Sequence, residues 1–418
     1  LEDRRVEELS GGQLQRLVVA CALAMDSRAL VLDEPLAYLD PRGARELMEL
    51  LVKLKGAGKA VVLIEHRLRD LVGFYEDIDE VLLLDEGRVV GRLAGRRLHE
   101  GVDKLIGLGL RVPANFEASS RLKAELSSPV DVEPLALFLK SLPQSVRALE
   151  GPRLRDGVVE VRGVWASYGG SSYALRDVSL RMEAGRSYAV MGPNASGKTT
   201  LLRVLMGLLK PKRGSVSFLG VKVRSLRNVV GLVGYVPQNP DLTLMSKTVR
   251  DELESRARGR SMEEVAKQLR VDDLLDRNPH SLSRGQRFRV ALAAALALNP
   301  KALLLDEPTT GQDEECIEAL GRAIRGFVEE GGLAVVVTHD VDFALNYADH
   351  CVVLNSGEVY AEGEVGEVLS RSDVTSRCGL ARPMVLDVCC SLGLPPIYGR
   401  LGAQLLWGRR GVEAQPWS

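Results

Sequence analysis

The segment from Gly192 to Thr200 has the residue types and spacing of a phosphate-binding loop. It reads Gly-Pro-Asn-Ala-Ser-Gly-Lys-Thr-Thr and fits G-x-x-x-x-G-K-[ST] at every fixed position. The glycines allow backbone N–H groups to surround phosphate oxygens, while Lys198 supplies a positive charge and Thr199 offers a hydroxyl to Mg²⁺. The segment therefore predicts a ligand that carries phosphate groups and a divalent cation.

The residues on either side of this loop predict the elements that would hold it. The apolar run 187–191 before the loop is typical of a buried strand, and the run 201–206 after it has helical character. A helix that begins near Lys198 would direct its positive end toward the phosphates. The order of strand, loop and helix is the one that such a loop requires, whereas a glycine-rich turn without a ligand would not require it.

Two carboxylates and a histidine follow other apolar strands. Asp306 and Glu307 come at the end of the run that begins at Ala302, and His339 follows the run 333–338. Parallel strands present their carboxyl ends at one edge of a sheet, so we expect these side chains beside the phosphate loop. Asp306 would then hold Mg²⁺ through water, and Glu307 would orient the water that attacks the γ-phosphate. The alternative is a solvated acidic turn and a structural histidine.

Gln238 and Tyr168 are further candidates for the site. Gln238 lies in a proline-flanked loop after a predicted strand, where its amide could reach the metal or the attacking water. The alternative is an ordinary loop amide. Tyr168 follows the strand-like run 161–165 and could stack on a nucleotide base, although the same position also suits a half-buried strand aromatic.

Composition excludes several classes of function. The 418 residues are 45% hydrophobic and 27% charged with a net charge of −1, so no overall field attracts nucleic acid or an acidic membrane. The six cysteines are scattered apart from one adjacent pair, which fits a reducing compartment better than a disulfide framework or a metal site. The sequence contains neither a membrane-spanning apolar run nor a signal peptide.

An internal duplication organises the chain. Ser10 and Ser283, Asp33 and Asp306, Glu34 and Glu307, Asp40 and Asp313, and His66 and His339 all differ by 273 positions. The segment Leu9-Ser-Gly-Gly-Gln13 precedes a helical run and resembles a second phosphate-facing turn, and its counterpart lies at 282–286. Two similar domains therefore follow one another.

The duplication predicts four segments. These are the C-terminal part of a first domain (1–95), a linker or helical appendage (96–155), a complete second domain (156–370) and a C-terminal tail (371–418). The counterpart of the Gly192 loop would fall before Leu1, so we expect the front of the first domain to be missing from this sequence.

These motifs together resemble those of the ABC ATPases. The resemblance implies an α/β fold with two P-loop NTPase domains in tandem, the first incomplete, each with a RecA-like sheet and a helical subdomain. It implies ATP and Mg²⁺ as ligands, with Glu307, His339 and Gln238 in catalysis and Thr199, Gln238 and Asp306 at the metal. The ATP-binding residues would be Tyr168, Gly192, Asn194, Ser196, Gly197, Lys198, Thr199, Thr200, Ser10, Gly11, Gly12 and Gln13.

In this family two domains face each other head to tail, so each ATP lies between the Walker A loop of one domain and the signature of the other. The resemblance thus implies one site built from the Gly192 loop and the signature 9–13. The mirror site would carry Arg284 where the signature usually has glycine. Arg284 either weakens phosphate binding there or adds a contact.

The segments 238–244 and 64–68 resemble the fused tandem ATPases of energy-coupling factor importers, which take up vitamins or transition-metal ions. This resemblance implies a transmembrane coupling protein and a substrate-binding membrane subunit as partners, no nucleic acid, no membrane span in this chain, and a place at the cytoplasmic face of the membrane. Two alternatives remain: a soluble tandem ATPase that acts on ribosomes, and a regulatory remnant without activity.

Overall fold

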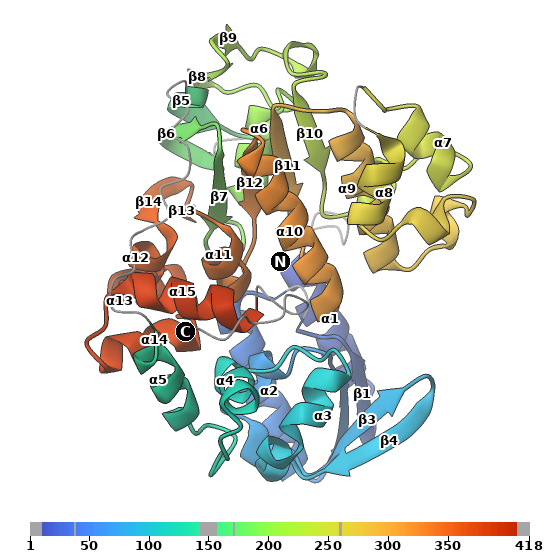
Figure 1. Ribbon diagram of the computed structural model, residues 1–418, viewed down its shortest axis with the longest axis vertical. Helices are drawn as coiled ribbons and strands as arrows, with labels where there is room; N and C mark the ends of the chain where they lie inside the picture. Colours follow the sequence, from blue (N-terminus) through green and yellow to red (C-terminus); the bar gives the residue numbers. More distant parts are fainter. Residues whose placement is uncertain (1–10, 37–38, 143–156, 170–171, 259–260, 408–418) are drawn as a thin grey trace, which may run out of the picture. The chain divides into compact units, whose positions relative to one another are not determined.

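The computed structural model describes residues 11–36, 39–142, 157–169, 172–258 and 261–407 of the chain (Figure 1). The chain divides into two compact units. Unit 1 comprises residues 1–147 and 381–418, and unit 2 comprises residues 148–380. The end of the chain thus belongs to the same unit as its beginning. The four domain boundaries predicted from the sequence stay a prediction.

Unit 2 is built on a six-stranded sheet in the order β10-β11-β12-β7-β13-β14, in which only β14 runs antiparallel to its neighbour. A second, antiparallel sheet has the order β6-β5-β8-β9. The α/β fold predicted from the sequence is confirmed. The strands are β5 (Gly157–Ala166), β6 (Leu175–Glu183), β7 (Arg186–Met191), β8 (Arg213–Phe218), β9 (Val221–Lys222), β10 (Val233–Val236), β11 (Ala302–Asp306), β12 (Leu333–Val337), β13 (His350–Asn355) and β14 (Glu358–Glu364).

Helices cover both faces of the six-stranded sheet. Every residue of β11 and β12 is buried, as expected for parallel strands between two helical layers. Leu303 and Leu305 belong to the core that includes α9 and α10, whereas Leu304 belongs to the core that includes α6. The helices are α6 (Lys198–Leu205), α7 (Val249–Glu254), α8 (Met262–Gln268), α9 (Arg284–Ala297), α10 (Glu314–Glu329), α11 (Val341–Tyr347), α12 (Val365–Ser370) and α13 (Ser372–Cys378).

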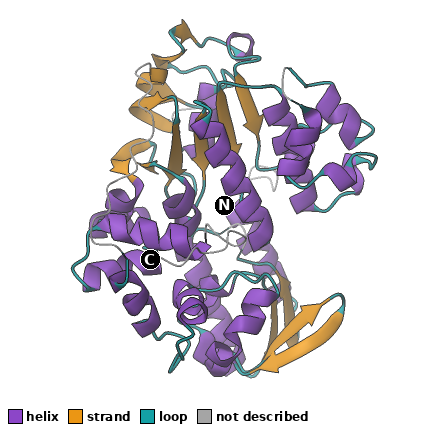
Figure 2. Cartoon of the chain, in the orientation of Figure 1, coloured by secondary structure: helices purple, strands orange, loops and turns teal. Residues whose placement is uncertain are grey.

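Unit 1 combines two small sheets with helices, as Figure 2 shows. Strands β1 and β2 pair in parallel, and β3 and β4 form an antiparallel hairpin. The elements are α1 (Gly11–Ala24), β1 (Ala29–Asp33), α2 (Pro41–Gly56), β2 (Ala60–Ile64), β3 (Val81–Asp85), β4 (Arg88–Leu93), α3 (Val102–Gly107), α4 (Ala114–Leu122), α5 (Glu133–Lys140), α14 (Met384–Ser391) and α15 (Pro396–Trp407).

The sequence duplication is visible in the backbone. The register of β1 with β2 begins at Ala29 opposite Ala60, and that of β11 with β12 begins at Ala302 opposite Leu333, so both pairs obey the offset of 273. Asp40 caps the N-terminus of α2 by accepting a hydrogen bond from the Gly43 N–H at 2.8 Å. Asp313 caps α10 in the same manner through the Cys316 N–H at 2.7 Å.

One face of the β1–β2 sheet is more exposed than the equivalent face of β11 and β12 in unit 2. Val31, Val62 and Ile64 are 65%, 51% and 50% exposed. Their equivalents in unit 2 are Leu304, Val335 and Val337, each 0% exposed because they pack in the core that contains α6. The exposed apolar face of unit 1 is therefore the face that the phosphate-loop helix covers in unit 2.

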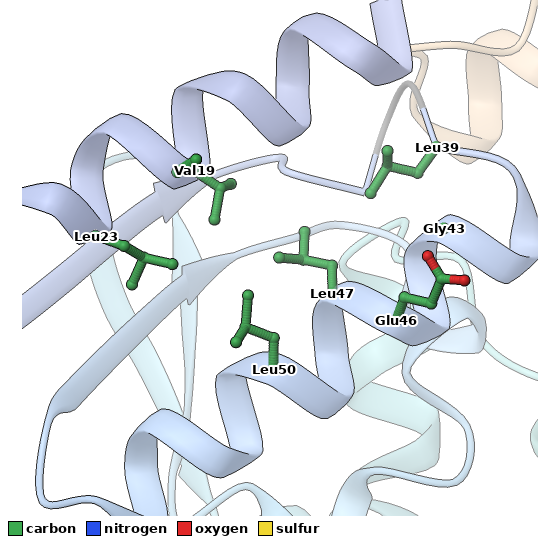
Figure 3. A pocket seen from close by; sticks show the side chains of 8 residues that line it. Val19, Leu23, Leu39, Gly43, Glu46, Leu47 and Leu50 are labelled. Atoms are coloured by element: carbon green, nitrogen blue, oxygen red, sulfur yellow. The ribbon is translucent and has the colours of Figure 1, made fainter. Parts of the chain in front are cut away.

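Unit 1 also contains a cavity of about 190 Å³ between α1 and α2 (Figure 3). Val19 and Leu23 from α1 face Leu47 and Leu50 from α2 across it. The equivalent positions in unit 2 are buried in a core shared with α7 and α8. Unit 1 thus repeats one layer of unit 2, and the two surfaces of that layer that further elements cover in unit 2 are apolar in unit 1.

We expect Val335→Thr to destabilise the chain and Val62→Thr, at the matched position of unit 1, to have little effect. The first substitution buries a hydroxyl in an apolar core, which costs about 1–3 kcal/mol, whereas the second changes a half-exposed side chain by less than about 0.5 kcal/mol. Differential scanning calorimetry should show a Tm lowered by several degrees for Val335→Thr alone. Equal shifts for the two variants would contradict the difference in burial.

Candidate functional site

The phosphate loop joins β7 to α6. Its backbone conformation leaves no room for side chains at two of its glycines. Gly192 and Gly197 have φ values of 138° and 103°. A Cβ atom on Gly192 would lie 2.0 Å from the carbonyl oxygen of Leu354, and one on Gly197 would lie 2.6 Å from that of Ala174. Both positions therefore require glycine, and the sequence motif corresponds to a steric need.

The side chain of the loop lysine, Lys198, is hydrogen-bonded to backbone carbonyls at the start of the loop. The Lys198 Nζ donates hydrogen bonds to the carbonyl oxygens of Gly192 at 2.8 Å and Pro193 at 2.9 Å, and its residue is 8% exposed. Ser196 is 2% exposed, and within the described residues its Oγ has no hydrogen-bond partner. A buried ammonium group and an unsatisfied hydroxyl in one loop suit an anionic ligand with several oxygen acceptors. Asn194 lies exposed in the same loop.

Asp306 lies beside this loop at the carboxyl end of β11. The Thr199 Oγ1 donates to its Oδ1 at 3.3 Å, and Asp306 is 2% exposed. Burial, followed by the nearby charge of Glu307, raises the pKa of Asp306 to about 6, against the opposite effects of Thr199 and Lys198. A carboxylate and a hydroxyl side by side in a buried site are oxygen ligands of the kind that Mg²⁺ takes. The predicted metal residues Thr199 and Asp306 are thus brought together.

Glu307 and His339 form the second polar contact at this edge. The His339 Nδ1 lies 2.7 Å from the Glu307 Oε2, and the His339 backbone N–H donates to the same oxygen at 3.3 Å. Burial alone would raise the pKa of Glu307, but the charge and hydrogen bond of His339 and the charge of Lys198 hold it below its ordinary value. Glu307 is therefore kept as a carboxylate, the form that can accept a proton from water.

The backbone of Glu307 is bent into the left-handed region, with φ at 49°. Its N–H donates to the Val337 carbonyl oxygen at 2.8 Å, which ties the bend to the neighbouring strand β12. Glu34 repeats the bend in unit 1, with φ at 44° and its N–H bonded to the Ile64 carbonyl oxygen. The His66 Nδ1 lies 3.3 Å from the Glu34 Oε1. Both copies thus keep the acid and histidine pair.

Tyr168 follows β5 and contacts α6, the helix after the phosphate loop. Its hydroxyl is 3.2 Å from the Thr200 Oγ1, and the Arg203 guanidinium donates to it at 3.2 Å while lying 5.4 Å from the ring centre. The ring is 58% exposed, so one side is open to a base. Stacking on adenine stays a prediction. Arg203 was missed by sequence reasoning, and its position five residues after Lys198 on one helix was the available signal.

Gln238 and the signature residues belong to other segments of the chain. Gln238 is exposed in the loop after β10, and among the described residues no hydrogen bond joins it to the phosphate loop, Asp306 or Glu307. Ser10 lies outside the described residues. Gly11, Gly12 and Gln13 form the first turn of α1, in unit 1. In unit 2 the counterpart Ser283 caps α9 through a reciprocal pair of hydrogen bonds with Gln286.

The chain is similar to known proteins over nearly its whole length. The family model described as ABC transporter matches residues 1–37 and 175–310. An ABC transporter ATP-binding protein of Saccharolobus solfataricus is 34% identical over 401 residues, which cover 93% of this chain and 73% of that protein. One from Methanosarcina mazei is 32% identical over 412 residues, covering 92% and 70%. Both alignments extend across the two copies of the duplication.

Solved structures are similar to about half of the chain. The structure titled cbiO1 from Clostridium perfringens, part of the ABC transporter complex cbiONQ, is 27% identical with a TM-score of 0.48, covering 59% of this chain and 98% of that one. A dimeric ATP-binding cassette in a post-hydrolysis state, bound to ADP and Pi, is 30% identical with a TM-score of 0.45, covering 50% and 98%.

We expect Glu307→Gln to abolish steady-state ATP hydrolysis, by roughly 100-fold or more, while ATP binding is retained. The amide keeps the size of the side chain and can still accept a hydrogen bond, but it cannot accept a proton from water. The measurements are phosphate release and equilibrium binding of ATP. Glu34→Gln is the matched control, because the printed sequence contains one phosphate loop and that loop adjoins Glu307. Hydrolysis that survives Glu307→Gln and fails in Glu34→Gln would reverse the assignment.

Proposed function

Because the chain belongs to the ABC transporter ATP-binding proteins, we propose that it powers a membrane importer of the energy-coupling factor type, for a vitamin or a transition-metal ion. As a member of this family the chain binds and hydrolyses ATP and is the nucleotide-binding part of a transporter. The importer type rests on the resemblance of the segments 238–244 and 64–68 to the tandem ATPases of that class. The chain would act at the cytoplasmic face of the membrane.

The observation that carries the proposal is the contact between Glu307 and His339 beside the phosphate loop. A carboxylate kept ionised and oriented by a histidine can polarise the water that attacks the γ-phosphate. Lys198 would counter the charge of the phosphates. Thr199 and Asp306 would hold Mg²⁺, which neutralises phosphate charge when bound, and Gln238 would join them by movement of its loop.

ATP would be enclosed by residues of both copies. We place the signature residues Ser10, Gly11, Gly12 and Gln13 opposite the phosphate loop of unit 2, as the head-to-tail arrangement of the family implies. Binding of ATP would then close the two cassettes on each other, and hydrolysis would release them. This closure is the motion that a membrane partner would follow.

A segment ahead of the first copy would complete it. The exposed side chains of Val31, Val62 and Ile64 and the cavity between α1 and α2 lie where unit 2 has α6 and the helices α7 and α8. A strand, phosphate loop and helical subdomain like those of unit 2 would bury these surfaces. Such a segment would also supply the mirror ATP site, whose signature carries Arg284.

The partner surface would lie just after Gln238. Leu242 and Met245 are 68% and 84% exposed. The backbone around them is nevertheless fixed, because the Met245 and Ser246 N–H groups donate to the buried Glu252 carboxylate at 2.9 and 2.8 Å. Apolar side chains on a rigid loop favour docking of an apolar helix, since little order is lost on binding.

The partners we propose are a transmembrane coupling protein, which contacts this surface, and a substrate-binding membrane subunit joined to it. In the described part of the chain no helix is long and apolar enough to cross a bilayer. The solute would then be recognised by the membrane subunits rather than by this ATPase.

We expect Ser10→Arg to abolish ATP hydrolysis and Ser283→Arg, at the matched position of the second copy, to leave most of it. Ser283→Arg removes the N-cap of α9, at a cost of about 1 kcal/mol, so a much larger loss of activity in Ser10→Arg would report the nucleotide site. Phosphate release is measured for both, with the Tm of each variant from differential scanning calorimetry as the control for folding. Equal loss in the two variants would contradict the shared site.

We expect the double change of Leu242 and Met245 to Asp to prevent co-purification with integral membrane proteins, because charge is then placed on the docking surface. The tagged chain is expressed in its native host, and its detergent-extracted partners are compared with those of wild type. Leu208→Asp is the control, since Leu208 is 53% exposed elsewhere in unit 2. Co-sedimentation with ribosomes, and no membrane partner for the wild type, would favour the soluble ATPase instead.

A further inference from the structure

The segment 207–232 of unit 2 is strongly biased in charge. It contains no acidic residue, although the whole chain has nearly equal numbers of basic and acidic residues, 55 and 56. Six basic residues lie in this segment, and each of them is exposed. They are Lys210, Lys212, Arg213, Lys222, Arg224 and Arg227. Six cations without an acid give the segment a charge of +6, in a chain whose net charge is −1.

These cations lie close together in the fold. Strands β8 and β9 form an antiparallel hairpin, which Figure 1 shows at the opposite end of unit 2 from α12 and α13. The chain after β9 runs back along β8, since the Val223 N–H donates to the Val216 carbonyl oxygen at 2.9 Å. It then packs on the turn after α6, where a Cβ atom on Gly207 would lie 2.5 Å from the carbonyl carbon of Ser225. We call the exposed side chains of 207–232 the basic face.

The strand beside β8 leaves this positive charge uncompensated. Its acidic residue, Glu160 on β5, lies opposite Ser217 on β8. The Glu160 carboxylate forms an ion pair with Arg162 of the same strand, with the Arg162 Nη2 at 2.7 Å from the Glu160 Oε2. The charge of Glu160 is therefore balanced within β5, and the basic face keeps its own charge.

Exposed apolar side chains lie among the cations. Leu208, Leu219, Val221, Leu226 and Val230 are 53%, 46%, 49%, 40% and 63% exposed. The aromatic residue of the segment, Phe218, is 0% exposed. Surfaces that bind single-stranded nucleic acid expose aromatic side chains on which bases stack, whereas cations mixed with exposed aliphatic side chains suit the boundary between lipid headgroups and acyl chains. The composition of the face thus favours a membrane surface over nucleic acid.

The backbone that presents Leu226 and Val230 is fixed by hydrogen bonds. The Asn228 Oδ1 accepts hydrogen bonds from the Arg224 and Ser225 N–H groups at 3.0 and 3.1 Å. The Val230 N–H donates to the Leu226 carbonyl oxygen at 3.2 Å, which closes a turn and brings these two apolar residues together. Little order is lost when a loop held in this way binds a surface.

We propose that the basic face binds the anionic headgroups of a phospholipid bilayer and holds the chain on the membrane independently of any protein partner. The six cations supply an attraction that weakens with ionic strength, because it acts between exposed charges. The aliphatic side chains enter the headgroup region and make part of the binding resistant to salt. This inference goes beyond the proposed function, in which a transmembrane subunit attaches the chain.

The phosphate loop and the basic face lie at opposite ends of α6. The helix begins at Lys198 in the loop and ends at Leu205, just before the face. An eight-residue helix is about 12 Å long, so contact with a bilayer at one end leaves the loop at the other end uncovered. Substitutions in the basic face should therefore leave ATP binding unchanged, and ATP binding is the control for folding in the tests below.

The first test measures co-sedimentation of the purified full chain with lipid vesicles at about 0.05 M and 0.5 M NaCl. The vesicles contain phosphatidylcholine alone or phosphatidylcholine with about 30% phosphatidylglycerol. At low salt we expect the anionic vesicles to bind the chain at least about tenfold more tightly than the neutral ones, because the phosphatidylglycerol headgroups attract the basic face. Equal binding to both kinds of vesicle overturns the proposal.

Two variants with the same change of net charge locate the contact. The test variant reverses three cations of the basic face and brings its charge from +6 to 0. Its substitutions are Lys222→Glu, Arg224→Glu and Arg227→Glu. The control variant reverses three exposed lysines outside the face, by Lys53→Glu, Lys247→Glu and Lys267→Glu. We expect the test variant to lose the preference for anionic vesicles and the control variant to keep most of it. Equal loss in the two variants overturns the proposal.

The second test separates the aliphatic side chains from the cations. Leu226→Ser with Val230→Ser should abolish the binding that remains at the higher salt concentration, without a change of charge. The matched control is Val132→Ser with Leu137→Ser, since these residues of unit 1 are 41% and 51% exposed. Equal salt dependence of the two double variants contradicts entry of the aliphatic side chains into the headgroup region.

A competition experiment decides between a bilayer and nucleic acid. Single-stranded RNA is added to the vesicle-bound chain at the phosphate concentration of the anionic lipid, and we expect most of the chain to stay on the vesicles. RNA that displaces the chain would assign the basic face to nucleic acid and overturn the proposal. These assays contain no importer subunit, so their outcome is independent of the type of transporter that the chain serves.

Discussion

The parallel pairing of β7, β12 and β11 is the constraint on which the nucleotide site depends. These three neighbouring strands end at one edge of the sheet, and each is followed at that edge by one part of the site: the phosphate loop, His339, and the pair Asp306 and Glu307. Because every residue of β11 and β12 is buried, the strands cannot slip without exposing apolar side chains. The buried core that fixes these strands therefore also fixes the relative positions of the site residues.

Two acids placed next to each other at this edge acquire opposite properties from their surroundings. Burial and the nearby charge of Glu307 raise the pKa of Asp306. Glu307 accepts two hydrogen bonds from His339, and its pKa lies below the ordinary value. The bend at Glu307 separates them, since its left-handed backbone directs the glutamate toward β12. One strand end can thus hold both a ligand for a cation and a base for water.

The two copies of the duplication share their local backbone geometry, but the packing around equivalent residues differs. Glu34 with His66 repeats the bend and the contact of Glu307 with His339, and the strand register is identical. The side chains that pack on the next layer are buried in one unit and exposed in the other. Local geometry follows from the residues themselves, whereas burial follows from which layers surround them.

The sequence by itself determined the phosphate loop, the order of strand, loop and helix, the duplication and the acids at strand ends, because each is a pattern of near neighbours along the chain. The α/β fold and family membership followed from those patterns. Only the tertiary structure decided the anchoring of Lys198 on loop carbonyls, the role of Arg203 beside Tyr168, and the packing of the last two helices onto α4 and α5. The residues in these contacts are not related by a regular helical or strand spacing in the sequence. Their burial and their distances, which set the energies of the contacts, exist only once the chain is folded.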